Sequence, residues 1–178
     1  MIFTEIQLKG VYIIEPERLA DERGFFARTW CQKELASHGL ENRLAQCSIS
    51  YNPKKGTLRG MHFQTAPWEE VKIVRCTCGA IYDVVIDLRP GSPTFKKWFG
   101  LTLSQEKRNM IYIPKGFAHG FMTLSDQVEV FYQISQFYVP DHADGVRWND
   151  PAFGIQWPME VQLISERDNT YPDFEPNK

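Results

Sequence analysis

A β-strand is predicted over the segment Thr57-Leu58-Arg59-Gly60-Met61-His62-Phe63-Gln64, in which polar side chains stand among apolar ones. Successive side chains of a strand point to opposite faces, so one face receives Leu58, Gly60, His62 and Gln64 and the other Arg59, Met61 and Phe63. A β-bulge at Gly60 would re-aim these side chains. The pattern therefore predicts an imidazole on an inward face of a sheet, unless a bulge redirects it.

Most of the remaining chain is also predicted to form short strands separated by turn residues. The predicted strands cover residues 71–78, 81–88, 98–103, 110–113, 120–124 and 128–138. One helix is predicted at residues 30–38, where Gly39 supplies a C-terminal stop. From Pro140 onward we expect ordered loops with short helical turns. This organisation predicts an all-β sandwich or barrel with a few short helices.

Bulk properties limit the classes of partner. The 178 residues suit one domain with a substantial core. Because 20 Lys and Arg residues nearly balance 22 Asp and Glu residues, no global field favours nucleic acid or an anionic membrane. No apolar run approaches the roughly 18 residues of a membrane span, and the N-terminus lacks signal-peptide features. We therefore expect a cytoplasmic protein that binds neither nucleic acid nor membrane, with its four cysteines reduced.

Two basic side chains stand among apolar strand residues. An isolated inward histidine such as His62 is more often a hydrogen-bonded core residue than a catalytic base. Lys72, however, lies within the apolar segment Val71-Lys72-Ile73-Val74, where burying an ammonium is costly unless negative charge compensates it. Together they favour a site that handles an anionic, carbonyl-bearing small molecule, with a phosphate or an enolate beside Lys72.

A metal site is the first competing interpretation. His119 follows Pro114-Lys115-Gly116, a pattern similar to the second half of the cupin metal motif. The first half of that motif normally supplies a His-x-His pair and a Glu, whereas this chain offers only His62. Two histidines without a third ligand at suitable spacing form a poor transition-metal site. We therefore predict no metal.

Tyrosines and a distant carboxylate complete the set of candidates. Tyr132 and Tyr138 have the same parity in the predicted strand, and they could simply be strand aromatics. One of them could instead donate a proton opposite His62. Asp168 has no distinguishing pattern in its own segment, Ser165-Glu166-Arg167-Asp168, and only the fold could bring it to His62.

Several motifs, taken together, strongly resemble the nucleotide-sugar epimerase family typified by dTDP-4-dehydrorhamnose 3,5-epimerase. They occur in the expected order and span nearly the whole chain. They are Asp21-Glu22-Arg23-Gly24-Phe25-Phe26, Arg59 to Gln64, Val71 to Val74, Asp83 to Arg89, Pro114 to Phe121, Trp148-Asn149-Asp150-Pro151 and Trp157-Pro158.

The resemblance implies a cupin-type double-stranded β-helix, or jelly roll, formed by a single domain over residues 1–178. It also implies a homodimer in which an N-terminal strand or arm reaches the partner, and an active site that needs no metal or other cofactor. The implied substrate is a nucleoside-diphosphate 4-keto-6-deoxy sugar. The implied reaction is epimerisation at carbons 3 and 5 through an enolate, in deoxysugar biosynthesis.

The same resemblance implies a role for each candidate residue. His62 would be the base, held by Asp168. Tyr132 would deliver a proton to the opposite face, and Lys72 would stabilise the enolate. The implied substrate-binding residues are Arg23 and Arg59 for the diphosphate, His119 near the sugar, and Phe26, Gln46 and Tyr138 near the nucleotide.

Some positions differ from the commonest family pattern. Arg28 and Ser48 replace a glutamate and an asparagine on the nucleotide side, and Asp144 replaces a longer glutamate. The pair Glu69-Glu70 makes the segment before Lys72 unusually acidic. The nucleotide is therefore left open. The alternatives are a mono-epimerase acting at carbon 3 or 5 of a different nucleotide sugar, a metal-dependent cupin, and a non-catalytic sugar-nucleotide binding module.

Overall fold

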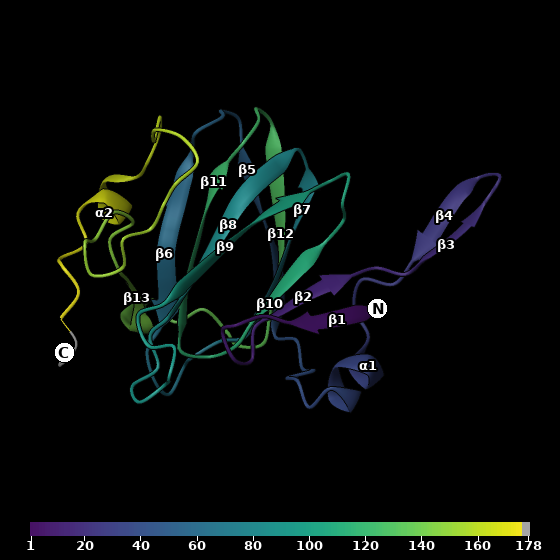
Figure 1. Cartoon of the computed structure of the whole chain (residues 1–178), viewed down its shortest axis with the longest axis horizontal. Coiled ribbons are helices and arrows are strands. Elements are labelled where there is room, and N and C mark those ends of the chain that lie inside the picture. Colours follow the sequence, from purple (N-terminus) through teal and green to yellow (C-terminus); the bar gives the residue numbers. More distant parts are fainter. Residues whose placement is uncertain (176–178) are drawn as a thin grey trace.

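The computed structural model describes residues 1–175, so the last three residues of the predicted 1–178 domain lie outside the description. Its largest element is a six-stranded antiparallel sheet (Figure 1). In spatial order its strands are β1 (Ile2–Glu5), β2 (Tyr12–Glu15), β10 (Met110–Ile113), β7 (Lys72–Cys78), β12 (Val128–Ile134) and β5 (Gln46–Asn52).

A second antiparallel sheet of five strands packs against the first (Figure 1). In spatial order its strands are β13 (Ala143–Gly145), β6 (Leu58–Gln64), β11 (Phe117–Thr123), β8 (Ala80–Asp87) and β9 (Trp98–Ser104). The helical segments are short: α1 (Gln32–Ser37), η1 (Pro140–His142) and α2 (Glu166–Asn169). This arrangement confirms the predicted all-β, cupin-like architecture. None of the described helices is long and apolar enough to cross a membrane.

The main core lies between the two sheets. Val74 and Val130 of the six-stranded sheet pack in one cluster with Val85 and Phe121 of the five-stranded sheet, and all four are almost completely buried. Facing side chains that interdigitate in this way are the main apolar contribution to the stability of a β-sandwich. One face of β7 faces this core and the other packs elsewhere, as the alternation in residues 71–78 predicts.

Two predicted elements end earlier than expected. The helix predicted at residues 30–38 is Gln32–Ser37, and Gly39 follows it with a positive φ of 69°, as a C-terminal stop requires. The strand predicted at 128–138 ends at Ile134, so Tyr138 lies beyond it. Ile134 is opposite Lys72, the first residue of β7, and the backbone pairing ends one residue further on, where the N–H of Ser135 donates to the carbonyl of Val71 at 3.0 Å.

An irregularity at Gly60 re-aims the side chains of β6. The pairing of β6 with β11 shifts register between His119 and Phe121, directly opposite Gly60. Gly60 has a φ of 137°, and a Cβ there would lie 2.5 Å from the Cα of Gly120. Only glycine fits both requirements.

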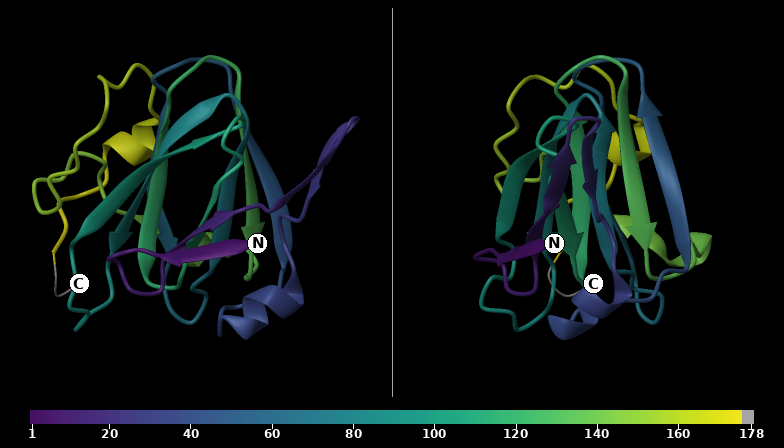
Figure 2. Two further views of the ribbon diagram at one scale, coloured as in Figure 1. Left: turned by 45° about the vertical axis from the view of Figure 1, so that its right-hand side comes forward. Right: turned by 90° about the vertical axis from the view of Figure 1, so that its right-hand side faces the viewer.

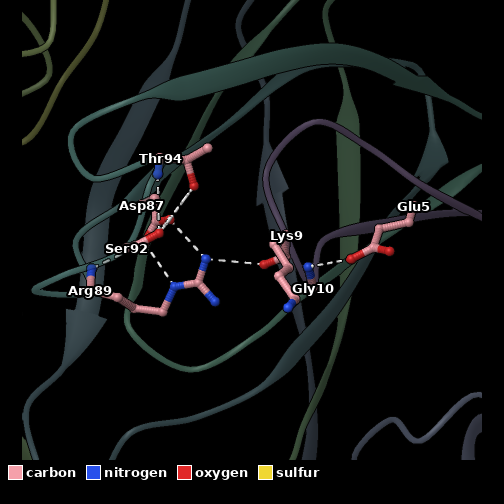
Figure 3. A network of polar contacts seen from close by, with 7 residues as sticks. All are labelled: Glu5, Lys9, Gly10, Asp87, Arg89, Ser92 and Thr94. Carbon is pink, nitrogen blue, oxygen red and sulfur yellow. Dashed lines mark hydrogen bonds and ion pairs between the residues drawn. The ribbon is translucent and has the colours of Figure 1, made fainter.

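A hydrogen-bonded carboxylate anchors the turn after β8 (Figure 3). Asp87 is fully buried and accepts hydrogen bonds from Arg89 Nε at 2.8 Å, Ser92 Oγ at 2.6 Å and Thr94 Oγ1 at 2.6 Å. Burial acts to raise the pKa of Asp87, but these donors outweigh it and lower the pKa to about 2. Arg89 also donates to the carbonyl of Lys9, which joins this turn to the loop between β1 and β2.

A two-stranded hairpin extends away from the sheets (Figures 1 and 2). It consists of β3 (Arg18–Asp21) and β4 (Gly24–Ala27), which pair only with each other. Leu19 and Phe26 on it are 70% and 71% exposed. Leu19 is directly opposite Phe26 in the hairpin, and neighbouring apolar side chains this exposed are typical of contact surfaces.

Candidate active site

A cavity of about 370 Å³ is lined by both sheets. The five-stranded sheet contributes residues of β6 and β11, and the six-stranded sheet contributes residues of β5, β7 and β12. Seven of the ten predicted site residues line it: Gln46, Arg59, His62, Lys72, His119, Tyr132 and Tyr138. Arg59 and His62 have opposite parity in β6, and both reach the cavity because of the irregularity at Gly60 between them.

Asp168 holds the partly exposed His62. The distance from His62 Nε2 to Asp168 Oδ1 is 2.8 Å, and Asp168 Oδ2 accepts the backbone N–H of Gly60 at 3.1 Å. The His62 side chain is 41% exposed, whereas that of Asp168 is 7% exposed. The imidazole therefore faces the cavity with a buried carboxylate behind it, which is the usual arrangement for orienting a catalytic histidine.

Local structure positions Asp168. It lies in the first turn of α2, where its N–H donates to the side chain of the N-cap residue Ser165 at 3.1 Å. Burial acts to raise the pKa of Asp168, but the hydrogen bond from His62 and that from Gly60 outweigh it, and the pKa is lowered. Asp168 is therefore an anion at neutral pH, and it can accept a hydrogen bond from His62 Nε2 when that nitrogen carries a proton. In the tautomer with the proton on Nε2, the Nδ1 atom of His62 carries the free lone pair.

Tyr132 approaches from the other sheet. It lies on β12, between Ser48 of β5 and Val74 of β7, and its ring packs against the main core. Burial raises the pKa of the Tyr132 hydroxyl, and the negative charge of Asp83 adds to the effect. The hydroxyl therefore keeps its proton at neutral pH and can serve as an acid.

A second histidine–carboxylate pair lies beside Tyr132. His119 is directly opposite His62 in the pairing of β11 with β6, and its Nε2 atom is 2.8 Å from Asp83 Oδ2. The side chains of His119 and Asp83 are 5% and 0% exposed. Burial raises the pKa of Asp83, although His119 and Lys72 oppose the shift. Asp83 begins one of the motifs quoted for the family resemblance and is a charged residue within an apolar strand, but no role was predicted for it from the sequence.

Lys72 is held beside this second pair. Its Nζ atom is 2.8 Å from Glu70 Oε1 and 3.5 Å from the carbonyl oxygen of His62. The Lys72 and Glu70 side chains are 13% and 7% exposed, so the ammonium and the carboxylate compensate each other's burial. Glu70 also lines the cavity, a position that the sequence analysis noted only as acidic.

Two arginines also line the cavity. Arg59 Nε donates to Asn52 Oδ1 at 2.7 Å, which orients the guanidinium. Arg167, which the sequence analysis missed, also lines the cavity and donates to the carbonyl of Ala143 at 3.0 Å. Guanidinium groups that line a cavity suit an anionic group such as a diphosphate.

Two predicted substrate-binding residues do not reach this cavity. Arg23 and Phe26 lie on the β3–β4 hairpin, where the Arg23 side chain is 89% exposed and pairs with Asp21. Of the unusual positions, Ser48 and Asp144 line the cavity, and Arg28 instead pairs with Glu34 outside it. Within residues 1–175, no three His, Cys, Asp or Glu side chains are grouped so as to hold a metal ion.

Comparison with known proteins decides the family. The family model described as dTDP-4-dehydrorhamnose 3,5-epimerase matches residues 5–176. The chain belongs to this epimerase family. Relatives of the family include the dTDP-4-dehydrorhamnose 3,5-epimerase of Sinorhizobium fredii, which is 40% identical over 98% of this chain and 90% of its own length.

Solved structures of family members superpose closely. The dTDP-4-dehydrorhamnose 3,5-epimerase of Bacillus anthracis, with TDP and PPi bound, is 39% identical and has a TM-score of 0.93, covering 97% of this chain and 99% of its own. The dTDP-6-deoxy-D-glucose-3,5-epimerase of Legionella pneumophila, in complex with dTDP-4-keto-L-rhamnose, is 37% identical, with a TM-score of 0.88 and coverage of 94% and 89%. The family's cupin-like fold is therefore the fold of this chain.

Proposed function

We propose that this chain epimerises dTDP-4-keto-6-deoxy-D-glucose at carbons 3 and 5 to give dTDP-4-keto-L-rhamnose. One observation carries the proposal: two acid–base groups, His62 and Tyr132, enter one cavity from different sheets, with the Lys72 ammonium beside them. Inverting a carbon requires a proton to leave one face and another to arrive at the opposite face. Groups supplied by two facing sheets meet that requirement.

His62 is the base in this proposal. The anionic Asp168 holds the Nε2 proton, so that Nδ1 is free to remove a hydrogen from a carbon next to the ketone. The C–H electron pair moves toward the C4 oxygen and forms an enolate, while the proton stays on His62. Asp168 then stabilises the imidazolium, as the carboxylate of a catalytic triad does.

Lys72 stabilises the enolate oxygen. This negative charge exists mainly in the intermediate and in the transition states on either side of it, so an ammonium fixed nearby accelerates the reaction rather than merely binding substrate. Tyr132 then gives its proton to the opposite face of the carbon, because its raised pKa keeps it protonated until that step. None of these steps uses a cofactor.

In our proposal, two copies of the chain together form the nucleotide-binding site. Arg59 binds the diphosphate, His119 contacts the sugar, and Gln46 and Tyr138 contact the nucleotide. Arg23 and Phe26 project on the hairpin and are too exposed to act within their own chain. We infer a homodimer in which each hairpin supplies these two residues to the partner's cavity. We also infer that residues 1–178 act as one domain, in the cytoplasm.

Solvent exchange tests the reaction directly. The protein is incubated with dTDP-4-keto-6-deoxy-D-glucose in D₂O, and deuterium at carbons 3 and 5 is followed by NMR and mass spectrometry. Incorporation at both carbons is expected. Incorporation at one carbon would make the chain a mono-epimerase, and none at either carbon would refute the proposed substrate.

Replacing Tyr132 by phenylalanine separates proton removal from inversion. In Y132F the base is intact, so His62 should still exchange its hydrogen with solvent deuterium and return it to the same face. Deuterium incorporation with little inverted product is the expected result. A variant that inverts as well as the wild type would remove Tyr132 from its proposed role.

Mixing two inactive variants tests the shared site. H62A lacks the base, whereas an R23A/F26A variant lacks the proposed hairpin contribution. If each hairpin serves the partner's cavity, a mixed dimer has one cavity with all components and regains activity. Unmixed samples are the controls, and light scattering gives the oligomeric state. A monomeric active protein would exclude this arrangement.

A further inference from the structure

The ion pair of Glu70 with Lys72 leaves one acceptor atom and one donor without a hydrogen-bond partner among the described residues. Glu70 Oε1 accepts from Lys72, but Glu70 Oε2 is buried and has no hydrogen-bond partner among the described residues. A carboxylate oxygen buried without a partner is costly, and such cases usually have a functional reason. Because Glu70 lines the cavity, its carboxylate is placed to accept a hydrogen bond from a hydroxyl group of a bound ligand.

Lys72 has one N–H donor without a described hydrogen-bond partner. An ammonium group carries three N–H donors. One meets Glu70 at 2.8 Å, and another points to the carbonyl of His62 at 3.5 Å. One N–H is therefore left for a ligand acceptor. Rotation about the last torsion of Glu70 is broad, so its carboxylate can turn an oxygen toward the cavity.

A donor and an acceptor one hydrogen-bond length apart match a specific chemical group. A carbonyl oxygen with a hydroxyl on the neighbouring carbon presents an acceptor and a donor at the same spacing. In a 4-keto-6-deoxyhexose, carbon 3 is the only neighbour of the ketone that bears a hydroxyl, because carbon 5 bears the methyl group and the ring oxygen. The pair therefore fits O4 on Lys72 and O3–H on Glu70.

We propose that Glu70 is a specificity-determining residue that accepts a hydrogen bond from the C3 hydroxyl of the substrate. This inference rests on the proposed function. Removing the carbon 3 proton to His62 creates a double bond between carbons 3 and 4, and the electron pair moves to O4. O3 and O4 then lie in the plane of the double bond, cis to each other. Lys72 and Glu70 hold this enediolate together, with the hydroxyl proton remaining on O3.

The carbon 5 step gains less from Glu70. Its enolate joins carbons 4 and 5, so that the C3 hydroxyl stays on a tetrahedral carbon outside the double bond. A contact that is stronger in the transition state than in the bound substrate raises the rate of the step. A contact that is equally strong in both changes only the binding of substrate. Glu70 should therefore favour carbon 3 over carbon 5, while Lys72 serves both steps.

Deuterium incorporation at the two carbons tests the inference within one reaction. In E70A and E70Q, the initial rate at carbon 3 should fall roughly 10–100-fold, the effect of losing one hydrogen bond to a charged group. The rate at carbon 5 should change less than about threefold. E69Q is the matched control, since it removes a neighbouring charge that does not line the cavity. K72M should lower both rates together.

The ratio of the two rates does not depend on how much protein is folded, which protects the test against partial unfolding. Equal loss at both carbons would show that Glu70 acts only through Lys72, and an unchanged ratio with full activity would show no role. Either result overturns the inference, as does a wild type that exchanges carbon 5 alone. A wild type that exchanges neither carbon would instead refute the proposed function.

Discussion

Two histidine–carboxylate pairs of the same length differ in their environments, and the histidine of each pair lines the cavity. His62 and Asp168 are 2.8 Å apart, as are His119 and Asp83. The His62 side chain is 41% exposed, but that of His119 is only 5% exposed. The pKa of Asp168 is lowered, whereas that of Asp83 is raised.

The number of hydrogen bonds explains this difference. Both oxygens of Asp168 accept a hydrogen bond, and its N–H is capped by Ser165. Asp83 Oδ1 has no partner among the described residues. A fully solvated or hydrogen-bonded carboxylate prefers its charged form, and a desolvated one does not. We therefore propose proton transfer for the first pair and a mainly structural role for the second, whose carboxylate lies fully buried behind His119.

The largest expected contrast is between H62A and H119A. H62A should lower the exchange rate roughly 10²–10⁴-fold because it removes the proposed base, and it should reduce the free energy of unfolding by less than H119A does, because water can reach Asp168 where the partly exposed His62 side chain stood. H119A should lower the exchange rate less than H62A does. It should reduce the free energy of unfolding by about 3 kcal/mol, because Asp83 is left buried without its partner. Exchange rates and urea unfolding measure both. If H62A and H119A changed the exchange rate and the free energy of unfolding by the same amounts, the two histidines would not have the different roles proposed for them.

The next contrast concerns the carboxylate behind the base. D168N should lower the exchange rate roughly 10²-fold, because a neutral amide does not stabilise the His62 imidazolium and favours the wrong tautomer. D144N is the control, since Asp144 also lines the cavity but contacts neither histidine. If D168N retained wild-type rates, His62 would not depend on Asp168.

Asp87 extends the comparison to a carboxylate with a full set of donors. The folded-state pKa of Asp87, about 2, lies below the ordinary 3.8. The ionised carboxylate therefore contributes about 2 kcal/mol to the free energy of unfolding above about pH 4, and this contribution is lost as the pH falls toward 2. Urea unfolding at several pH values should show D87N to be less stable than wild type at pH 7, with the gap narrowing below pH 4. A constant gap would contradict the assignment.

The smallest expected effect is that of D83N on stability. Burial raises the pKa of Asp83, so its charged form is already disfavoured in the folded protein. D83N removes this buried charge, and that gain offsets the weaker hydrogen bond to His119. D83N should change the free energy of unfolding by less than about 1 kcal/mol at pH 7. A loss several times larger would show that Asp83 is a well-stabilised anion like Asp168.

Local sequence patterns determined much of the architecture. Alternation along residues 71–78 and 81–88 predicted β7 and β8, and the limits predicted at 110–113 are those of β10. The motifs around His62, Lys72 and His119 indicated the family, which the comparisons confirmed. These properties follow from sequence because strand alternation is a local consequence of backbone geometry.

Only the tertiary structure decided which side chains meet. Asp168 lies 106 residues from His62, and nothing in its own segment marks it as a partner. The pairing of Asp83 with His119, the contact of Glu70 with Lys72 and the position of Arg23 outside the cavity were equally absent from the pattern. Register between strands, the irregularity at Gly60 and burial set these contacts, and each depends on residues far apart in the chain.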